Sequence, residues 1–455
     1  MWQGQNYLWL SHSSSSGGGQ SSNRVSGSNT NRLVFVQVYH RHGDRTPLLC
    51  LHKNHDLETK MWSGLVCKSY SPYVLPAHMD TDQDSLIETE NPHHVRTHDT
   101  DADPHEKKEA NKLCQWKNIA QRLRGAYLVH SNDNYYGDNY TIDSRDPKRF
   151  KDKLELLTFE RHYTKAWMGQ LTERGVRQME EVGRWLRKRY IDELGYLSPT
   201  FHSGNDGTSN SNKLWIQSTN FARTMYSVDS LLMGLYPMTH RTGENKSIAI
   251  HVDIDKTFFY PYPKLCRKWS RVRQQNSAYL EANSDKHFYF YFYLSFQKKG
   301  GKREGKKKKI EITLNINITQ KKKKKKSLGE ALLCRLAHQK DLPADIPQET
   351  IRDYCDYSAK RVTYQYSRND ESCRLAFGVM LDKLFHSMKH DDGMFRIVSC
   401  HDNTILSLLA ALKKEIPGWP PYASTIIFEV QLITSFSFTK KLYGYTIYII
   451  YMLAH

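Results

Sequence analysis

The chain has 455 residues, of which 39% are hydrophobic and 25% are charged, which is typical of a globular protein with one large α/β domain or two to three smaller units. The formal net charge of +18 resembles that of a nucleic-acid binder, but residues 298–326 alone hold 14 lysines and arginines against two glutamates. Because that segment supplies two thirds of the charge, the remaining chain is only mildly basic, and we expect no nucleic-acid partner.

The cysteines and the apolar runs exclude two further classes of protein. The eight cysteines are scattered and show neither a C-x-x-C pair nor the spacing of a zinc site, so we expect free thiols. The sequence shows neither a cluster of metal ligands nor a glycine-rich phosphate loop with a lysine, so we expect no metal or other cofactor. No apolar run reaches the roughly 18–20 residues of a spanning helix, so no membrane span is expected.

Residues 1–32 are rich in Ser, Gly, Asn and Gln, and Arg24 and Arg32 are their only charges. They lack the apolar segment of a secretory signal, which favours a disordered tail. A serine-rich, acid-free composition is also compatible with a mitochondrial presequence. The expected location is therefore mitochondrial or cytoplasmic.

The first strong pattern is an apolar run from Leu33 to Tyr39, which predicts a buried strand and leads into His40-Arg41-His42-Gly43-Asp44-Arg45-Thr46-Pro47. Gly43 and Pro47 indicate that the strand ends near His42, and the carboxyl ends of strands are where ligands bind in open α/β sheets. The guanidinium groups of Arg41 and Arg45 suit a phosphate dianion, and an imidazole between them is a competent nucleophile toward phosphorus. The alternative interpretation is a charged turn after a strand.

Residues 48–168 are polar and rich in loop-forming residues, and the next regular element begins beyond them. Thr172 is expected to cap a helix that runs to about Tyr190 and packs an apolar stripe on the sheet. The stripe consists of Val176, Met179, Val182, Leu186 and Tyr190. Residues 213–217 predict a second strand, and the helix that follows it, through Leu235, carries Arg223 in its first turn. This arginine is expected at the same sheet edge as His42.

Beyond a further strand that begins at Ile248, the composition changes abruptly. Residues 288–327 contain an aromatic run and lysine runs, and their composition is of low complexity, dominated by Lys, Asn, Ile, Phe and Tyr. All of these have A/T-rich codons, so our hypothesis is a retained intron in the gene model. A spliced transcript that contains these codons would refute it. If the segment belongs to the protein, it is an insertion outside the core.

The C-terminal third returns to ordinary sequence. Residues 351–384 predict helix with an interruption near 367–370, and residues 395–400 predict a strand. His401 and Asp402 follow that strand and precede an apolar helix that begins at Ile405. The His-Asp dipeptide occurs four times in the chain, and only here does it stand between an apolar strand and an apolar helix. Another strand is expected at 425–432, and residues 438–455 form an atypical tail.

These segments resemble the histidine acid phosphatases, whose signature has the form of Arg41-His42-Gly43-Asp44-Arg45-Thr46-Pro47. The likeness covers 33–47, 169–190, 213–237, 248–270 and 395–432. Within the family, Leu197-Ser198-Pro199-Thr200-Phe201 and Trp419-Pro420-Pro421-Tyr422-Ala423 resemble the lysophosphatidic acid phosphatase branch.

The resemblance implies a three-layer α/β/α sandwich of the phosphoglycerate mutase-like, histidine phosphatase type with a helical cap. The domain would span 33–437, with its core at 33–47, 169–255 and 390–433 and its cap and insertions at 48–168 and 256–389. The resemblance also implies residue roles. His42 would be the nucleophile that forms phosphohistidine, and Asp402 would protonate the leaving oxygen. The phosphate ligands would be Arg41, Arg45, Arg223 and His401.

An enzyme that hydrolyses a small-molecule phosphate monoester is thus the expected function, and an acidic pH optimum follows if Asp402 must be protonated. Lysophosphatidic acid is the leading substrate, and inositol phosphates and sugar phosphates are the alternatives. Two departures from the family's pattern are Gln217, where an arginine is usual, and His40, where an aromatic residue is usual. The competing interpretation is a non-catalytic phosphate-binding protein of the same fold.

Overall fold

The structure is a computed structural model. It describes residues 30–48, 55–68, 124, 127–131, 141–143, 167–202, 213–219, 221–243, 246–253, 266–283, 330–341, 348–390, 393–414, 418–434 and 442–450. Most of the predicted tail at 1–32, most of 48–168 and the low-complexity segment 288–327 lie outside the described residues.

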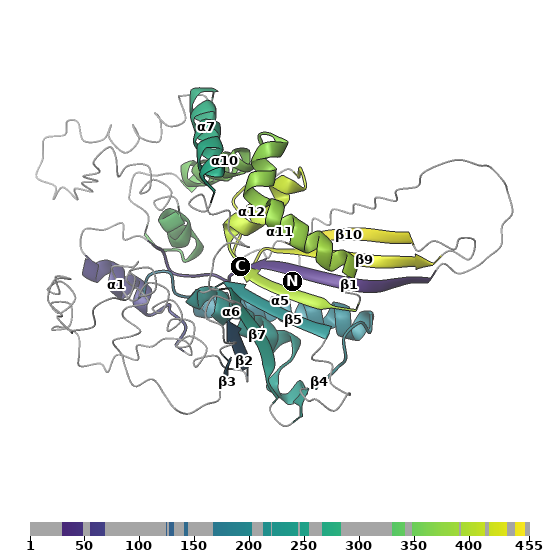
Figure 1. Cartoon of the computed structure of the whole chain (residues 1–455). Helices are drawn as coiled ribbons and strands as arrows, with labels where there is room; N and C mark the ends of the chain where they lie inside the picture. The colour runs from purple at the N-terminus through teal and green to yellow at the C-terminus, as the bar shows by residue number, and fades with distance from the viewer. Residues whose placement is uncertain are drawn as a thin grey trace, which may run out of the picture.

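Within the described residues, an eight-stranded sheet in the order β10-β9-β1-β8-β5-β7-β2-β3 forms the middle layer (Figure 1). The strands are β1 (Thr30–Arg41), β2 (Tyr127–Ser131), β3 (Thr141–Asp143), β5 (Leu214–Thr219), β7 (Ile248–Asp253), β8 (Phe395–Cys400), β9 (Thr425–Thr434) and β10 (Leu442–Ile450). The run β1-β8-β5-β7-β2 is parallel, while β3, β9 and β10 are antiparallel to their neighbours. A separate two-stranded pair joins β4 (Phe201–His202) to β6 (Arg241–Thr242).

Helices cover both faces of this sheet. On one face lie α5 (Glu173–Arg187), its continuation η2 (Lys188–Glu193) and α6 (Ala222–Leu235). On the other lie α11 (Asp370–His390) and α12 (Asp402–Ala411), with α10 (Gln348–Ser367) and α7 (Arg267–Asn283) packed against the same cluster (Figure 1). The remaining pieces are α1 (His55–Ser63), η4 (Met238–His240) and a helical segment at 330–337. The predicted three-layer α/β/α fold class is confirmed.

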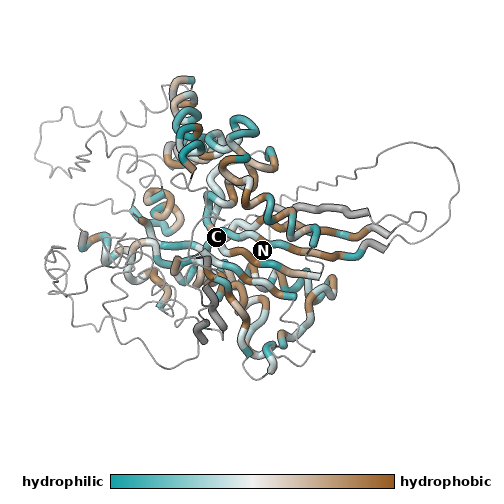
Figure 2. Tube along the Cα trace, in the orientation of Figure 1, coloured by the Kyte–Doolittle hydropathy of each residue, from teal (hydrophilic) through white to brown (hydrophobic). Residues whose placement is uncertain are grey.

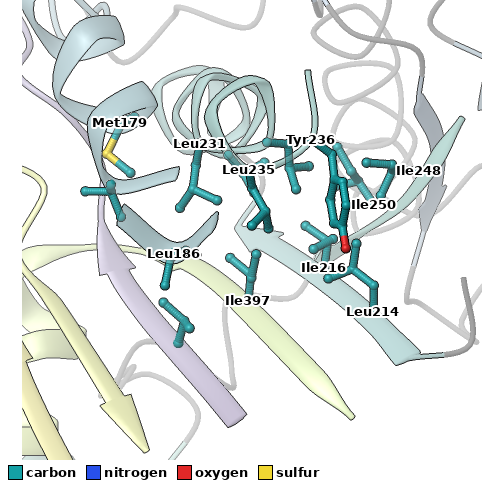
Figure 3. Close-up of a cluster of buried hydrophobic side chains, with 14 of the residues drawn as sticks. Met179, Leu186, Leu214, Ile216, Leu231, Leu235, Tyr236, Ile248, Ile250 and Ile397 are labelled. Atoms are coloured by element: carbon teal, nitrogen blue, oxygen red, sulfur yellow. The ribbon is translucent and has the colours of Figure 1, made fainter. Parts of the chain in front are cut away.

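Strand β1 is buried on both of its faces, which explains the nearly continuous apolar run in its sequence. Val36 and Val38 of β1 belong to the cluster with α5 and α6, whereas Phe35 and Tyr39 belong to the opposite cluster. Figure 3 shows Leu231 and Leu235 of α6 lying over the isoleucines of the strands, and Figure 2 shows hydrophobic residues along the strands and the helices packed on them. Because successive side chains of a strand point to opposite faces, the apolar residues of β1 pack into one or the other of the two hydrophobic clusters.

The predicted helix after Thr172 forms largely as expected. The Thr172 side chain accepts a hydrogen bond from Gly175 N at 3.1 Å, which caps α5, and the whole predicted apolar stripe is buried. The last turn differs, because the chain continues as a π-helix from Lys188 instead of ending near Tyr190. Tyr190 and Arg189 of that turn bond to the buried Glu429 carboxylate on β9, at 2.7 Å and 2.8 Å, which ties the wider turn to the sheet.

The remaining predicted elements are present with small shifts of their ends. The expected interruption near 367–370 separates α10 from α11. The helix after β8 begins at Asp402, three residues earlier than expected. His401 stays extended as its N-cap residue, and the Asp402 carboxylate accepts a hydrogen bond from Asn403 N at 2.7 Å. A carboxylate is favourable at a helix N-terminus, so the helix can start directly after the strand.

The described cysteines are all free thiols, and several of them are buried. Burial raises the pKa of Cys355 and Cys400 to about 12, so both thiols stay protonated at neutral pH. Within the described part of the chain, no helix has the length and apolarity that crossing a membrane requires.

Helices α5 and α6 approach each other through a pair of glycines, and this contact yields a prediction about stability. A Cβ added to Gly183 would lie 2.0 Å from Leu231 O, and one added to Gly234 would lie 2.1 Å from Glu180 O. We expect Gly183→Ala to lower the free energy of unfolding by about 1–3 kcal/mol or more, because the helices must move apart. Urea unfolding of the purified protein measures this change.

Gly378→Ala in α11 is the matched control, since it is also a mid-helix glycine. Its added Cβ would meet only a side-chain carbon of Arg374 at 3.5 Å, so alanine should be neutral or stabilising by up to about 1 kcal/mol. Equal stabilities for the two variants would contradict the close helix contact.

Candidate active site

The carboxyl ends of β1, β8 and β5 meet at one edge of the sheet. The register pairs Arg41 with Cys400 and Ser218 with Ser399, so the residues that follow each strand emerge side by side. His42 continues from β1, His401 continues from β8, and α6 begins shortly after β5. The predicted meeting of these segments at one sheet edge is therefore observed.

His42 lies at the centre of this edge and is only 2% exposed. Its backbone N–H donates to Cys400 O at 3.1 Å, and its carbonyl accepts from Ala423 N at 3.1 Å, so the end of β8 and the residues just before β9 hold it. The ring Nδ1 lies 2.8 Å from Gly43 O. Because a carbonyl oxygen can only accept, Nδ1 carries the hydrogen and Nε2 keeps the lone pair that a nucleophile needs.

The surroundings of His42 favour its neutral form. Burial is the largest cause that holds the pKa of His42 well below its ordinary value, followed by the positive charges of Arg223, Arg41 and Arg45. The ring of His401 is a neighbour, with centroids 5.7 Å apart. An imidazole in this setting stays unprotonated, and so nucleophilic, even in mildly acidic solution.

Arg41 is held by three different groups. Its guanidinium donates to Pro420 O, lies 4.1 Å from the centroid of the Tyr422 ring, and reaches Asp402 Oδ2 at 3.4 Å. The Arg41 side chain is 4% exposed and that of Asp402 is 16% exposed, so the pair lies at the margin between protein and solvent. These contacts fix the Arg41 cation beside the carboxylate of Asp402, the predicted proton donor.

The other two predicted cations come from different elements. Arg45 is buried, and its Nη1 donates to Thr46 O at 2.9 Å and to Glu330 Oε1 at 2.5 Å. Arg223, in the first turn of α6, is 9% exposed and stacks over the Phe221 ring at 4.5 Å. The positive charges of both lower the pKa of His42, as the charge of Arg41 does, so all three arginines act electrostatically on the same ring.

His401 and Asp402 stand at the junction of β8 and α12. His401 Nε2 forms a hydrogen bond with Thr219 Oγ1 at 3.0 Å, and its ring meets the Phe221 ring edge-on at 5.0 Å. Asp402 Oδ2 accepts from Trp419 Nε1 at 3.2 Å. The structure thus brings all six sequence-predicted site residues to one sheet edge, from three separate segments.

The loop that follows His42 is packed too closely for larger residues. A Cβ on Gly43 would lie 2.4 Å from Gly175 O, and one on Gly175 would lie 2.2 Å from Asp44 O. Gly43 N donates to Ser227 Oγ at 3.0 Å. The Asp44 carboxylate lies 2.7 Å from His338 Nε2 and accepts from Thr172 Oγ1 at 2.5 Å. Asp44 is therefore a buried anchor of the loop.

Several residues that contact this site were not predicted from the sequence. Tyr422 packs on both Arg41 and His42, and its ring centroid lies 5.8 Å from that of His42. Glu330 and His338 come from a segment that the sequence placed among the insertions. Tyr422 lies in a stretch that resembles the family, which indicated family membership but gave no role to Tyr422 itself. Glu330 and His338 carried no signal.

The two departures from the family's pattern lie on β5 and β1, which are separated in the sheet by β8. Gln217 is half-buried on β5, where its register partners are His251 and Val398. His40 is fully buried on β1. The His40 Nδ1 lies 3.2 Å from Arg41 O, and within the described residues its Nε2 has no hydrogen-bond partner. His40 is thus a neutral imidazole in the core directly beneath the site.

His40 makes stability depend on acidity. Burial lowers the pKa of His40 to about 4, against 6.5 in an unfolded chain. As the pH falls below about 6.5, His40 of the unfolded chain binds a proton, whereas His40 of the folded chain binds one only near pH 4. Unfolding is therefore favoured by up to about 3 kcal/mol at the acidic end. We expect His40→Phe to remove this part of the acid dependence, as measured by urea unfolding at about pH 7 and pH 4.5. An unchanged difference between the two pH values would contradict this.

Parts of the chain are similar in sequence to known proteins. A sequence model described as histidine phosphatase superfamily (branch 2) matches residues 32–288. Testicular acid phosphatase of Mus musculus is 27% identical over 279 residues, which cover 58% of this chain and 59% of that protein. Lysophosphatidic acid phosphatase type 6 of Homo sapiens is 35% identical over 114 residues, which cover 24% of each chain. A phytase crystal structure from Klebsiella sp ASR1 aligns with a TM-score of 0.44 and 12% identity, over 89% of this chain and 79% of the phytase.

The match to the testicular acid phosphatases spans about three fifths of their length, 59% in both Mus musculus and Homo sapiens. The family model covers more than half of the present chain, from β1 to beyond α7. His42, Arg41, Arg45 and Arg223 lie inside the matched region, whereas His401 and Asp402 lie beyond its end.

Proposed function

The chain belongs to branch 2 of the histidine phosphatase superfamily, and we propose that it is an acid phosphatase that hydrolyses phosphate monoesters through a phosphohistidine intermediate at His42. The single observation that carries the proposal is the setting of His42. It is a buried, neutral imidazole with Nε2 as its basic nitrogen, and the positive charges of three arginines act on it.

Phosphate monoesters hydrolyse extremely slowly without a catalyst, so an enzyme for them must stabilise a large negative charge. Arg41, Arg45 and Arg223 supply fixed positive charge, and guanidinium forks match phosphate oxygens bidentately. His401, which is held by Thr219, completes the proposed set of phosphate ligands. A low-dielectric surrounding strengthens each of these interactions.

In the first proposed step, His42 Nε2 attacks phosphorus, and the bond from phosphorus to the ester oxygen breaks. The electron pair of that bond stays on the leaving oxygen, which takes a proton from the Asp402 carboxyl group. The products of this step are the free alcohol, a phosphoryl group on Nε2 and the Asp402 carboxylate. A phosphate dianion beside Arg41 replaces Asp402 as its ionic partner, and the nearby negative charge favours the protonated acid.

In the second step, water attacks phosphorus and the phosphorus–nitrogen bond breaks. Asp402 accepts the proton that water releases, and inorganic phosphate leaves with His42 neutral again. This return of the acid to its starting form makes the cycle repeatable. It also predicts greater activity on the acidic side of neutrality, because Asp402 must begin each cycle protonated.

We further propose lysophosphatidic acid as the leading substrate, with inositol phosphates and sugar phosphates as alternatives. Support for it comes from the 35% identity to lysophosphatidic acid phosphatase type 6 over 114 residues. Rates of phosphate release from these three substrates, measured side by side at about pH 5, test the choice. Preference for an inositol phosphate would overturn it.

For the domain organisation, we propose one phosphatase domain over 33–437, with residues 288–327 absent from the mature protein. Two segments on either side of that gap support a single unit, because β7 and β8 both pair with β5 in one sheet. Sequencing of the spliced transcript tests the omission of codons 288–327.

The proposed activity is tested by incubating the protein with an aryl phosphate at about pH 5 and quenching it within one turnover. We expect phosphate release and a protein-bound phosphoryl group that is labile in acid and stable in base, as a phosphohistidine is. A folded protein that binds inorganic phosphate and never turns over would instead support the non-catalytic alternative.

A further inference from the structure

The helical segment at 330–337 contacts the loop after His42 through its first residue. Glu330 Oε1 accepts a hydrogen bond from Arg45 Nη1 at 2.5 Å, and Oε2 accepts one from Leu48 N at 3.2 Å. The carboxylate thus bridges the Arg45 side chain and the backbone three residues later. Glu330 is 18% exposed and Arg45 is 3% exposed, so the pair is largely shielded from solvent.

This contact fixes the orientation of the Arg45 guanidinium. Nη1 has two hydrogens, and its two acceptors are Glu330 Oε1 and the carbonyl of Thr46 at 2.9 Å. Because the guanidinium is planar and rigid, fixing one of its nitrogens fixes the plane of the whole fork. A preorganised guanidinium loses less conformational entropy when it binds an anion than a mobile one does.

Glu330 is itself held firmly, because its segment is anchored on several sides. Arg335 forms a buried ion pair with Glu58 of α1. Arg174 of α5 donates to Ala337 O, and His338 lies 2.7 Å from Asp44 in the loop after His42. The position of the Glu330 carboxylate is therefore set by the packing of α1, α5 and this loop together.

The charges around His42 are also partly balanced within the protein. Asp402 neutralises Arg41 at 3.4 Å, and Glu330 neutralises Arg45 at 2.5 Å. A phosphate dianion that enters must share Arg45 with the Glu330 carboxylate. A fixed negative charge here weakens the hold on inorganic phosphate, which is the product that must leave in each cycle.

We propose that Glu330 is a positioning residue that aims Arg45 at the phosphoryl group and lowers the affinity of the site for inorganic phosphate. This inference rests on the proposed function for its role in turnover. Its effect on binding stands on the Arg45 contact alone, so it can be measured whether or not the protein turns over.

The test compares Glu330→Gln with Glu330→Ala by calorimetric titration with inorganic phosphate at about pH 5. Glutamine keeps an oxygen that can accept from Arg45 but removes the charge, so we expect phosphate to bind roughly three- to tenfold more tightly than to the unaltered protein. Alanine removes both the charge and the orienting contact. We therefore expect weaker binding to Glu330→Ala than to Glu330→Gln, and kcat/KM about tenfold below that of the unaltered protein.

Glu193→Gln is the matched control, because it removes the same charge at the far end of the sheet. Glu193 is exposed in η2, and Tyr190 of the same turn packs on Phe395 at the start of β8, whereas His401 follows the end of that strand. This variant should leave phosphate affinity unchanged. Thermal unfolding of each variant checks that it is folded, and the isosteric glutamine keeps the comparison meaningful if alanine fails.

The outcomes separate this inference from the proposed function. If the unaltered protein hydrolyses phosphate esters and Glu330→Gln binds phosphate no more tightly, the role of Glu330 is overturned alone. If the unaltered protein binds phosphate without turnover and Glu330→Gln binds it more tightly, the inference stands and the catalytic proposal fails. If the unaltered protein binds no phosphate, both are overturned.

Discussion

His42→Ala is expected to lower phosphate release from an aryl phosphate at about pH 5 on the order of 10⁴-fold or more. Removal of a nucleophile costs this much in enzymes that form a covalent intermediate, because the surrounding charges cannot replace the missing bond. In this chain, the nearby His401 imidazole is held by Thr219 and lies 5.7 Å away between ring centroids, so it is not placed to substitute. The measurement is kcat under saturating substrate, together with the amount of acid-labile protein-bound phosphate, which should fall to zero.

The same substitution should leave the anion site largely intact. The His42 ring is neutral and donates only to Gly43 O, so its loss leaves Arg41, Arg45 and Arg223 with their own contacts. We therefore expect His42→Ala to bind inorganic phosphate with an affinity within about tenfold of that of the unaltered protein. His386→Ala, at an exposed position on α11, is the control for loss of a histidine in general. Turnover by His42→Ala above about one hundredth of the normal rate would contradict a phosphohistidine at this residue.

The sequence predicted the parts of the site that lie close together along the chain. Arg41, His42 and Arg45 fall within five residues, and the apolar run before them marks the end of a strand. Arg223 and the pair His401 and Asp402 could be found for the same reason, since each follows an apolar strand and begins a helix. Parallel strands bring such positions to one edge of a sheet, so the three segments could be joined before their pairing was known.

The contacts that hold these groups in place could not be predicted, because they join residues far apart in sequence. Glu330 meets Arg45 across 285 positions, and Cys334 meets Tyr422 across 88. No local pattern sets such a distance, since it depends on how segments of the chain pack. The π-helical turn at 188–193 was missed for a related reason. Its contact with Glu429 of β9, a residue 240 positions from Arg189, is a tertiary interaction that helical periodicity does not contain.

For His40, the sequence predicted the position in the strand but not the effect of the residue on stability. Its place in the strand was evident, and the family's preference for an aromatic residue marked it as unusual. Only the structure shows that the ring is fully buried with its Nε2 lacking a partner within the described residues. A folded chain with such a residue loses stability in acid, because the unfolded chain gains the proton first.

Asp402→Asn is expected to reduce kcat/KM by roughly 10²–10⁴-fold for an alkyl phosphate, and by much less for an aryl phosphate with a good leaving group. An alkoxide is a poor leaving group and needs a proton as the ester bond breaks, whereas a nitrophenolate leaves without one. Asparagine keeps one oxygen, which can accept from Asn403 N as Oδ1 of Asp402 does, so α12 should begin at the same residue, while the bond from Trp419 Nε1 to Oδ2 is lost. Its amide nitrogen cannot serve as the acid.

The measurement is kcat/KM for a series of phosphate esters whose leaving alcohols differ in pKa, because kcat/KM excludes the later hydrolysis of phosphohistidine, which is the same for every ester. In the unaltered protein, kcat/KM should depend weakly on that pKa, because proton transfer compensates for a poor leaving group. In Asp402→Asn the dependence should become steep. A uniform loss for every ester would instead assign Asp402 to the placement of Arg41, its partner at 3.4 Å, and would leave the leaving oxygen to be protonated by another group. The slope therefore separates proton donation from electrostatic positioning, which a single rate constant cannot do.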